Sequence, residues 1–145
     1  MKRFNFRLQN VLKWRLLQVE TSEEKLQEFL RELRTLEAQQ ASLEAAKAEA
    51  ERSVLEAKQV EAQDLAALDT HRRWVAAQQQ RLARHARECD TRISAQREQV
   101  RKAERNLKLI EKLRARRLGE WSAAVDKEFQ ALAEEAFLAR WPRSE

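Results

Sequence analysis

His85 and Cys89 come closest to a chemical site in this chain, because a spacing of four places both side chains on one face of a helix. Such a pair supplies a thiolate and an imidazole for nucleophilic catalysis, or two ligands for zinc. Catalysis also needs a group that orients the base, and zinc needs three or four ligands. The chain offers only one further histidine, His71, and no second cysteine. We therefore expect no catalysis and no metal, and we expect Cys89 to pack as a small apolar residue.

Cofactor binding is not expected either. Loops that hold the phosphates of a nucleotide are rich in glycine, whereas this chain has a single glycine, Gly119. The sequence therefore predicts a protein that is not an enzyme and carries no cofactor. Its function is expected to come from binding other proteins.

The composition predicts long helices. Ala, Glu, Lys, Leu and Arg account for 91 of the 145 residues, and there is one glycine and one proline. Such a composition is typical of coiled coils, and a chain with so few turn-forming residues changes direction rarely. We predict an all-α fold of two long helices in an antiparallel coiled-coil hairpin.

Two apolar stripes with helical spacing support this prediction. The first runs from Leu8 to Ala57, mostly at steps of three, four or seven residues. The second alternates steps of three and four, which defines a heptad seam, and it slips in phase once near Leu113. Its members are Leu82, Ala86, Cys89, Ile93, Gln96, Val100, Ala103, Leu107 and Ile110, followed by Leu118, Trp121, Val125, Phe129, Leu132, Ala136 and Ala139.

The turn between the helices is expected at residues 63–73. The first stripe fades there, and Asp69 and Thr70 have side chains that cap a helix N-terminus. The chain is then a single domain, 1–145, with helix one at about 5–67 and helix two at about 71–141. In this hairpin, residue i lies beside a residue numbered about 138 − i.

The distribution of charge favours antiparallel pairing. Residues 1–17 carry a net charge of +5, 18–70 carry −7, 71–117 carry +10 and 118–145 carry −3. A hairpin brings acidic segments beside basic ones, and flanking charges set orientation in coiled coils. If the two halves lay parallel, the basic start would meet the basic 71–117 segment. The competing architecture is one unbroken helix of about 135 residues in a parallel dimer.

Nucleic acid is a partner to consider, because the basic residues between Arg72 and Arg105 form a run that could neutralise phosphates. However, the acidic 18–67 segment has nearly the same length and lies alongside in the predicted hairpin. No aromatic residues alternate with the basic ones to stack on bases. We therefore do not expect nucleic acid as a partner.

A membrane span is not expected, since no run of 18 apolar residues is present. A secretory signal is not expected either, because Lys13 and Arg15 interrupt the apolar residues that follow the basic start. The single cysteine allows no internal disulfide. A cytoplasmic location without direct membrane insertion is the simplest expectation.

Four tryptophans, Trp14, Trp74, Trp121 and Trp141, are unusual in a thin coiled coil. Trp121 falls on the second stripe, where packing is the default role, whereas Trp14 lies off its stripe between Lys13 and Arg15. Exposed aromatic residues beside arginine are typical of protein-binding hot spots. The sequence is equally compatible with tryptophans that clamp the two ends of the hairpin.

Two phrases near the ends of the chain resemble the FliJ family of flagellar export proteins. The first is Phe4-Asn5-Phe6-Arg7-Leu8-Gln9-Asn10-Val11-Leu12, which is similar to the aromatic-x-aromatic-Arg-Leu opening of the family. The second begins with Leu109-Ile110-Glu111-Lys112-Leu113-Arg114-Ala115-Arg116-Arg117 and continues through Trp121 to Leu132-Ala133-Glu134-Glu135-Ala136. Family members often have Asp-Glu after the late leucine, where this chain has Ala133-Glu134.

The resemblance implies an antiparallel two-helix coiled coil, similar to the stalk of rotary ATPases, at the cytoplasmic face of the inner membrane at the flagellar base. The implied partners are the export ATPase ring, the cytoplasmic domain of the membrane-embedded export gate, and export chaperones. The end that holds both termini is expected to enter the ring, with the candidate residues Arg7, Trp14, Arg114, Arg116, Arg117 and Trp121. The candidates for the gate are Trp74, Gln78, Arg81, Leu82 and His85.

Two other functions stay open from the sequence. The equivalent stalk protein of a virulence type III secretion system has the same shape, although the terminal phrases favour the flagellar version. A generic coiled-coil scaffold, with or without nucleic-acid binding, has the same composition and periodicity.

Overall fold

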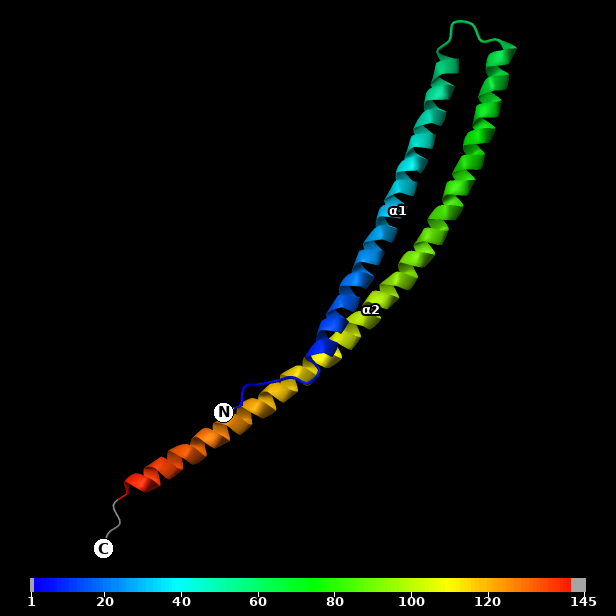
Figure 1. Ribbon diagram of the computed structural model, residues 1–145. Coiled ribbons are helices and arrows are strands. Elements are labelled where there is room, and N and C mark those ends of the chain that lie inside the picture. The colour runs from blue at the N-terminus through cyan, green and yellow to red at the C-terminus, as the bar shows by residue number, and fades with distance from the viewer. Residues whose placement is uncertain (1, 142–145) are drawn as a thin grey trace. The chain divides into compact units, whose positions relative to one another are not determined.

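The computed structural model describes residues 2–141 and contains two helices, α1 (Gln9–Leu55) and α2 (Ala62–Arg140). Residues 56–61 join them, and the two helices pack against each other in opposite directions (Figure 1). No strand occurs among the described residues. The predicted all-α fold with a helical hairpin is therefore confirmed.

The chain contains two compact units, and the predicted single domain, 1–145, stays a prediction. Unit 1 combines Met1–Glu20 with Arg101–Glu145, and unit 2 is Thr21–Val100. Both helices contribute residues to both units, because α1 and α2 extend across the boundaries at residues 20 and 100.

The start of α2 has a local cause. The backbone N–H of Glu61 donates a hydrogen bond to Asp64 Oδ2 at 3.1 Å, which is the contact that the third helical residue makes in a capping box. The carboxylate of Asp64 also lies in the first turn, where the helix dipole stabilises negative charge. Asp64 is therefore the residue that signals the beginning of the second helix.

The predicted turn at residues 63–73 is wrong, since these residues are helical. Asp69 does not cap a helix, because its carboxylate pairs with Arg73 one turn later at 3.0 Å. The hydroxyl of Thr70 donates to the carbonyl of Ala66 at 3.0 Å inside the helix. Both side chains thus have helical partners, and the chain turns at residues 56–61 without glycine or proline.

The pairing register of the two helices also differs from the prediction, because the chain turns earlier, at residues 56–61. Gln79 bonds to Glu44, and the buried Gln96 bonds to the carbonyl of Ser22, so the numbers of facing residues add to 123 and 118 instead of 138. A heptad pattern repeats every seven residues, so it fixes which face of a helix is apolar but does not fix where the hairpin turns.

The core of unit 2 follows the second apolar stripe, as predicted. Val75 is fully buried, and the stripe continues through Leu82, Cys89, Ile93, Gln96 and Val100, each at most 9% exposed. Burying an aliphatic side chain of this kind stabilises a fold by about 1.5–3 kcal/mol. The α1 side of this seam is only half-buried.

Unit 1 is organised differently. Residues 2–8 precede α1 and lie along α2, where Phe6 is buried, and Leu12 and Ala103 are buried where the two helices meet. Beyond Trp121, residues 122–140 are exposed except for the half-buried Val125. We predicted that both chain ends share one tip; instead α2, with 79 residues against 47 in α1, extends past the N-terminal segment.

Among residues 2–141, no helix combines the length and the apolar character that crossing a membrane requires.

Candidate partner-binding surfaces

His85 and Cys89 do not form a reactive pair. Cys89 is 2% exposed, and its thiol donates to the backbone carbonyl of Phe29 at 3.3 Å. Burial raises the pKa of this thiol, and the nearby carboxylates of Glu32 and Asp90 add to the increase. His85 is exposed instead, with Nδ1 at 3.8 Å from Glu88 Oε2. A buried neutral thiol is a poor nucleophile, so this arrangement favours a packing role for Cys89.

Metal ligands do not gather anywhere among residues 2–141: no group of three or more His, Cys, Asp or Glu side chains there could hold an ion.

An open groove of about 810 Å³ lies between the N-terminal segment and α2 in unit 1. We call it the N-terminal groove. Its lining mixes aromatic, aliphatic and basic side chains: Arg3, Phe4, Asn5, Phe6, Arg7, Leu8, Leu113, Arg117, Glu120 and Trp121. Apolar walls with a few charged groups at the rim are typical of sites that bind ligands or peptides.

Three contacts hold the N-terminal segment on α2. The indole N–H of Trp121 donates to the carbonyl oxygen of Lys2 at 3.1 Å. The ring of Phe4 packs against Trp121 with a centroid distance of 5.9 Å and a tilt of 55°, and the guanidinium of Arg114 lies 5.7 Å from the centre of the Phe4 ring. Aromatic and cation–π contacts of this kind each contribute about 0.5–1.5 kcal/mol. The segment is therefore anchored on α2 by aromatic packing and by the hydrogen bond from Trp121 to the Lys2 carbonyl.

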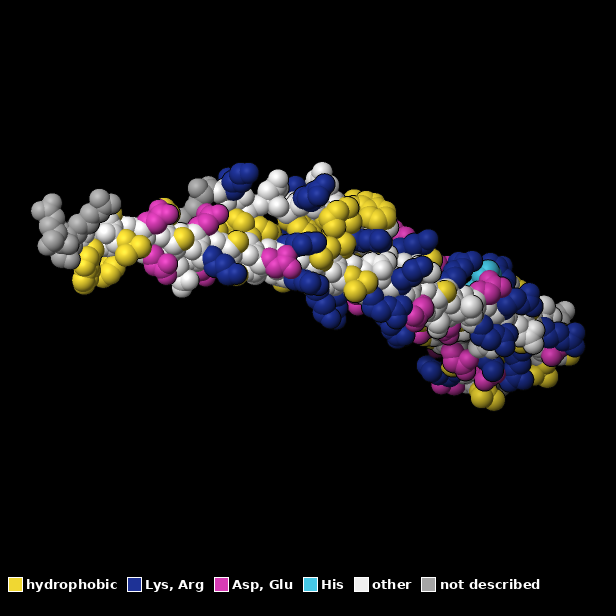
Figure 2. All heavy atoms as spheres, turned by 90° about the horizontal axis from the view of Figure 1, so that it is seen from below, with side chains coloured by type: hydrophobic (Ala, Val, Ile, Leu, Met, Phe, Trp, Pro, Cys, Tyr) yellow, Lys and Arg dark blue, Asp and Glu magenta, His cyan; other side chains and the backbone are white. Residues whose placement is uncertain are grey.

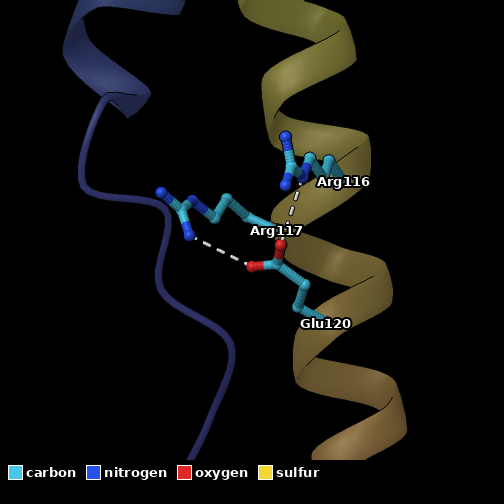
Figure 3. A network of polar contacts seen from close by, with 3 residues as sticks. All are labelled: Arg116, Arg117 and Glu120. Carbon is cyan, nitrogen blue, oxygen red and sulfur yellow. Dashed lines mark hydrogen bonds and ion pairs between the residues drawn. The ribbon is translucent and has the colours of Figure 1, made fainter.

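The arginines beside the groove share one carboxylate. Arg117 Nη1 lies 3.1 Å from Glu120 Oε2, and Arg116 Nε lies 3.2 Å from Glu120 Oε1 (Figure 3). In Figure 3, the Arg117 side chain extends toward the N-terminal segment. All three side chains are about half-exposed or more, and exposed ion pairs are worth about 0–1 kcal/mol. A partner's carboxylate can thus replace Glu120 at little cost.

The structure brings together most of the residues predicted for the terminal end. Arg7, Arg117 and Trp121 line the N-terminal groove, Arg114 contacts its Phe4, and Arg116 joins through Glu120. Trp14 is not among the lining residues. It is 52% exposed, with the guanidinium of Arg15 at 4.7 Å from its ring centre.

Positive charge accumulates around this groove. Residues 2–20 and 101–121 together hold thirteen basic and four acidic side chains. We expected residues 1–17 to face the acidic 118–137 segment; with the turn at 56–61, the N-terminal residues lie beside basic residues of α2 instead. In Figure 2, hydrophobic and acidic side chains show at the end of α2, and Lys and Arg side chains gather farther along.

The residues predicted for the gate lie in unit 2 and divide into two groups. Trp74, Gln78, Arg81 and His85 follow steps of four, three and four and share one helix face. Trp74 is 53% exposed and stacks on His71 at 6.1 Å, Arg81 and His85 are exposed, and Gln78 is half-buried. We call these four residues the Trp74 face.

Leu82 does not belong to this surface, because it is 8% exposed and packs in the seam. It faces α1 one heptad after Val75, so the proposal that it binds a partner is corrected to a core role.

Sequence reasoning missed a second groove, of about 410 Å³, near the turn of unit 2. Its lining includes Val54, Val60, Leu68 and His71, and His71 Nε2 is buried without a hydrogen-bond partner. Alanines on both helices leave this space, and their clustering on either side of residues 56–61 is the only sequence signal for it.

Comparisons with known proteins found no match: no protein-family model, no curated protein and no solved structure matches this chain.

Proposed function

We propose that this chain is a non-catalytic coiled-coil component of a flagellar protein export apparatus, which engages the export ATPase ring and the export gate and assists the delivery of chaperones and substrates. One observation carries the proposal. The two phrases that resemble the FliJ family, more than 100 residues apart in the sequence, meet in one groove. Phe4 and Arg7 from the first phrase line it together with Leu113 and Arg117 from the second.

The N-terminal groove has the chemistry of a surface that receives an acidic protein segment. Arg3, Arg7 and Arg117 supply positive charge at its lining, and Phe4 and Trp121 supply apolar contact area. Exposed arginine beside aromatic residues is the composition that dominates binding energy in protein interfaces. An acidic loop of the ATPase ring is therefore the proposed occupant, and the separate Trp74 face is the proposed surface for the gate.

The test is stimulation of the export ATPase by the full chain. Replacing Arg114, Arg116 and Arg117 by alanine should reduce stimulation about tenfold or more, because charge pairs at an interface control both encounter and residence. The matched control replaces Arg84, Arg87 and Arg97, three exposed arginines of unit 2, which lowers the net charge equally. Circular dichroism should show unchanged helix content in both variants. Equal stimulation by both would remove the groove from the mechanism.

A second candidate function follows from the charge of unit 1. We propose as this alternative a scaffold that binds nucleic acid, supported by the thirteen basic and four acidic side chains of residues 2–20 and 101–121. Binding of duplex DNA should then weaken steeply with salt, since released counterions drive such binding. DNA binding without stimulation of any export ATPase would favour the alternative, and the opposite result would favour the export function.

A further inference from the structure

The last quarter of α2 presents an apolar stripe that nothing in unit 1 covers. Residues 122–140 are exposed except for the half-buried Val125. Phe129 is 53% exposed and Leu132 is 59% exposed. Apolar side chains of this size are normally withdrawn from water, and a row of them on one helix marks an interaction surface.

The spacing of the stripe indicates that another helix covers it. Leu118, Trp121, Val125, Phe129, Leu132, Ala136 and Ala139 follow one another at steps of three and four. At 3.6 residues per turn these seven positions fall within a narrow arc of the helix surface. This is the seam of a coiled coil, which requires a facing helix with the same spacing.

The charges on either side of the stripe indicate which helix that is. Arg117 precedes the stripe and Glu135 stands near its end; they are 18 residues apart, or about five full turns, so both lie on the same flank of the stripe. A parallel copy of the same segment would place arginine beside arginine and glutamate beside glutamate. An antiparallel copy places Glu135 of each chain beside Arg117 of the other, so opposite charges flank the seam at both ends.

The side chains of the stripe also match in the antiparallel arrangement. With a two-fold axis near residue 127, Val125 faces Phe129, Trp121 faces Leu132, and Leu118 faces Ala136 of the other copy. Large side chains thus meet smaller ones in successive layers, as a well-packed seam requires. Phe4 and the Lys2 carbonyl contact Trp121 on one side, whereas Leu118 stays 38% exposed. The second copy therefore lies next to the N-terminal segment.

The stripe extends along the whole uncovered segment. Residues 118–140 form about six turns of helix on each chain, and the seven stripe positions recur over all of that length. We propose that residues 118–140 of two copies of this chain pair as an antiparallel coiled coil. This inference does not rest on the proposed function. It implies that self-association and an acidic partner compete for Arg117.

The first experiment measures the mass of the full chain in solution by sedimentation over a range of concentrations. We expect a reversible monomer–dimer equilibrium. Replacing both Phe129 and Leu132 by aspartate should raise the dimer dissociation constant about 30-fold or more, because each dimer loses four central apolar contacts. The matched control replaces both Phe137 and Leu138 by aspartate. These two side chains are at least as exposed as Phe129 and Leu132 but lie on another side of α2, so the dimer dissociation constant should stay unchanged.

A chain that stays monomeric at every concentration would overturn the proposal. Equal weakening by the Phe137 and Leu138 control would also overturn it, because the stripe would then not be the interface. A dimer that both pairs leave intact would place self-association elsewhere in the chain and would likewise contradict the proposal.

The second experiment tests the direction of pairing by exchanging charges. Replacing Arg117 by glutamate, or Glu135 by arginine, should each weaken the dimer about tenfold, since like charges then meet at both ends. Combining both changes in one chain should restore the wild-type constant. In a parallel dimer each exchange only swaps one pair of like charges for another. Unchanged affinity in the two separate variants would therefore rule out the antiparallel pairing.

Discussion

Units 1 and 2 are made from the same two helices and the same few residue types, yet they use them differently. In unit 2 the apolar stripes cover each other, and acidic side chains of α1 meet polar and basic ones of α2, as in Glu51–Arg72 and Glu44–Gln79. In unit 1 basic residues lie near basic residues, and the end of α2 has no covering helix. The difference teaches that heptad periodicity supplies stability where a partner helix is present and leaves apolar side chains exposed where it is absent.

The inequality of the two helices produces this division. α1 has 47 residues and α2 has 79, so α1 cannot cover the whole of α2. The remaining length carries an apolar stripe with the spacing of a seam. Unit 2 is therefore expected to respond to mutation as a folded core, and unit 1 as a surface.

The largest expected effect separates a covered stripe from an uncovered one. Replacing Ile93, which is 4% exposed, by aspartate should lower the free energy of unfolding by about 4 kcal/mol or more, because an unpaired charge enters the seam. Phe129, which is 53% exposed, should cost about 0.5 kcal/mol or less in the same substitution. Urea unfolding followed by circular dichroism, at concentrations where the chain is monomeric, measures both. Similar losses at the two positions would abolish the distinction between the units.

A second effect belongs to the buried thiol of unit 2. The pKa of Cys89 is raised above its ordinary value of 9.0 in the folded chain, first by burial. The buried neutral thiol therefore stabilises the folded chain fully below pH 9.0. This stabilisation is lost as the pH rises through the raised pKa of the folded state, because the unfolded thiol ionises first. The slope is at most about 1.4 kcal/mol per pH unit. Urea unfolding at pH values on both sides of 9.0 should show this loss in the wild type and a smaller one in Cys89→Ala; equal slopes would contradict it.

A third effect concerns the N-terminal segment of unit 1. Replacing Trp121 by alanine removes the ring that packs on Phe4 and the N–H that bonds to Lys2. Trypsin should then cleave after Arg3 and Arg7 about fivefold faster, since local opening becomes easier by about 1 kcal/mol. Trp14→Ala is the control, because Trp14 does not line the N-terminal groove. Faster cleavage in the control alone would show that the segment is held by other contacts.

The smallest effect is expected for the charges that cross between the helices of unit 2. Arg72→Ala removes an ion pair of 3.1 Å with Glu51, in which both side chains are partly exposed. The loss of unfolding free energy should be about 0.5 kcal/mol or less and should shrink with added salt. A loss comparable to that of Ile93→Asp would mean that charge, and not the apolar seam, stabilises the hairpin.

The fold class could be predicted because composition and periodicity both report it directly. Each member of the second stripe from Cys89 to Ala103 is buried as expected. The turn could not be predicted from the same pattern, since shifting the register by whole heptads leaves every apolar residue facing the partner. The position of the turn depends instead on the hydrogen bond between Glu61 and Asp64, which caps the N-terminus of α2.

The candidate surfaces were predictable to the extent that they depend on residue type. Arginine and tryptophan near the ends of the chain indicated a candidate binding surface there, because these residue types dominate the binding energy of protein interfaces. Leu82 was assigned to a surface although it lies one heptad from Val75, a position that the stripe itself marks as core. The uncovered stripe at residues 118–140 was hidden by the wrong turn, which had supplied it with a partner in α1.

The six-residue connection at 56–61 also orders the assembly of the hairpin in time. Contacts near it close short loops, as Arg72 and Glu51 are 21 residues apart, whereas Gln96 and Ser22 are 74 apart and Trp121 and Lys2 are 119 apart. Because closing a longer loop costs more entropy, pairing begins at this connection and proceeds away from it. During synthesis, Phe4 and Phe6 emerge from the ribosome well before Trp121 and dock only once Trp121 has been made. They thus stay open to other proteins while most of the two helices are translated.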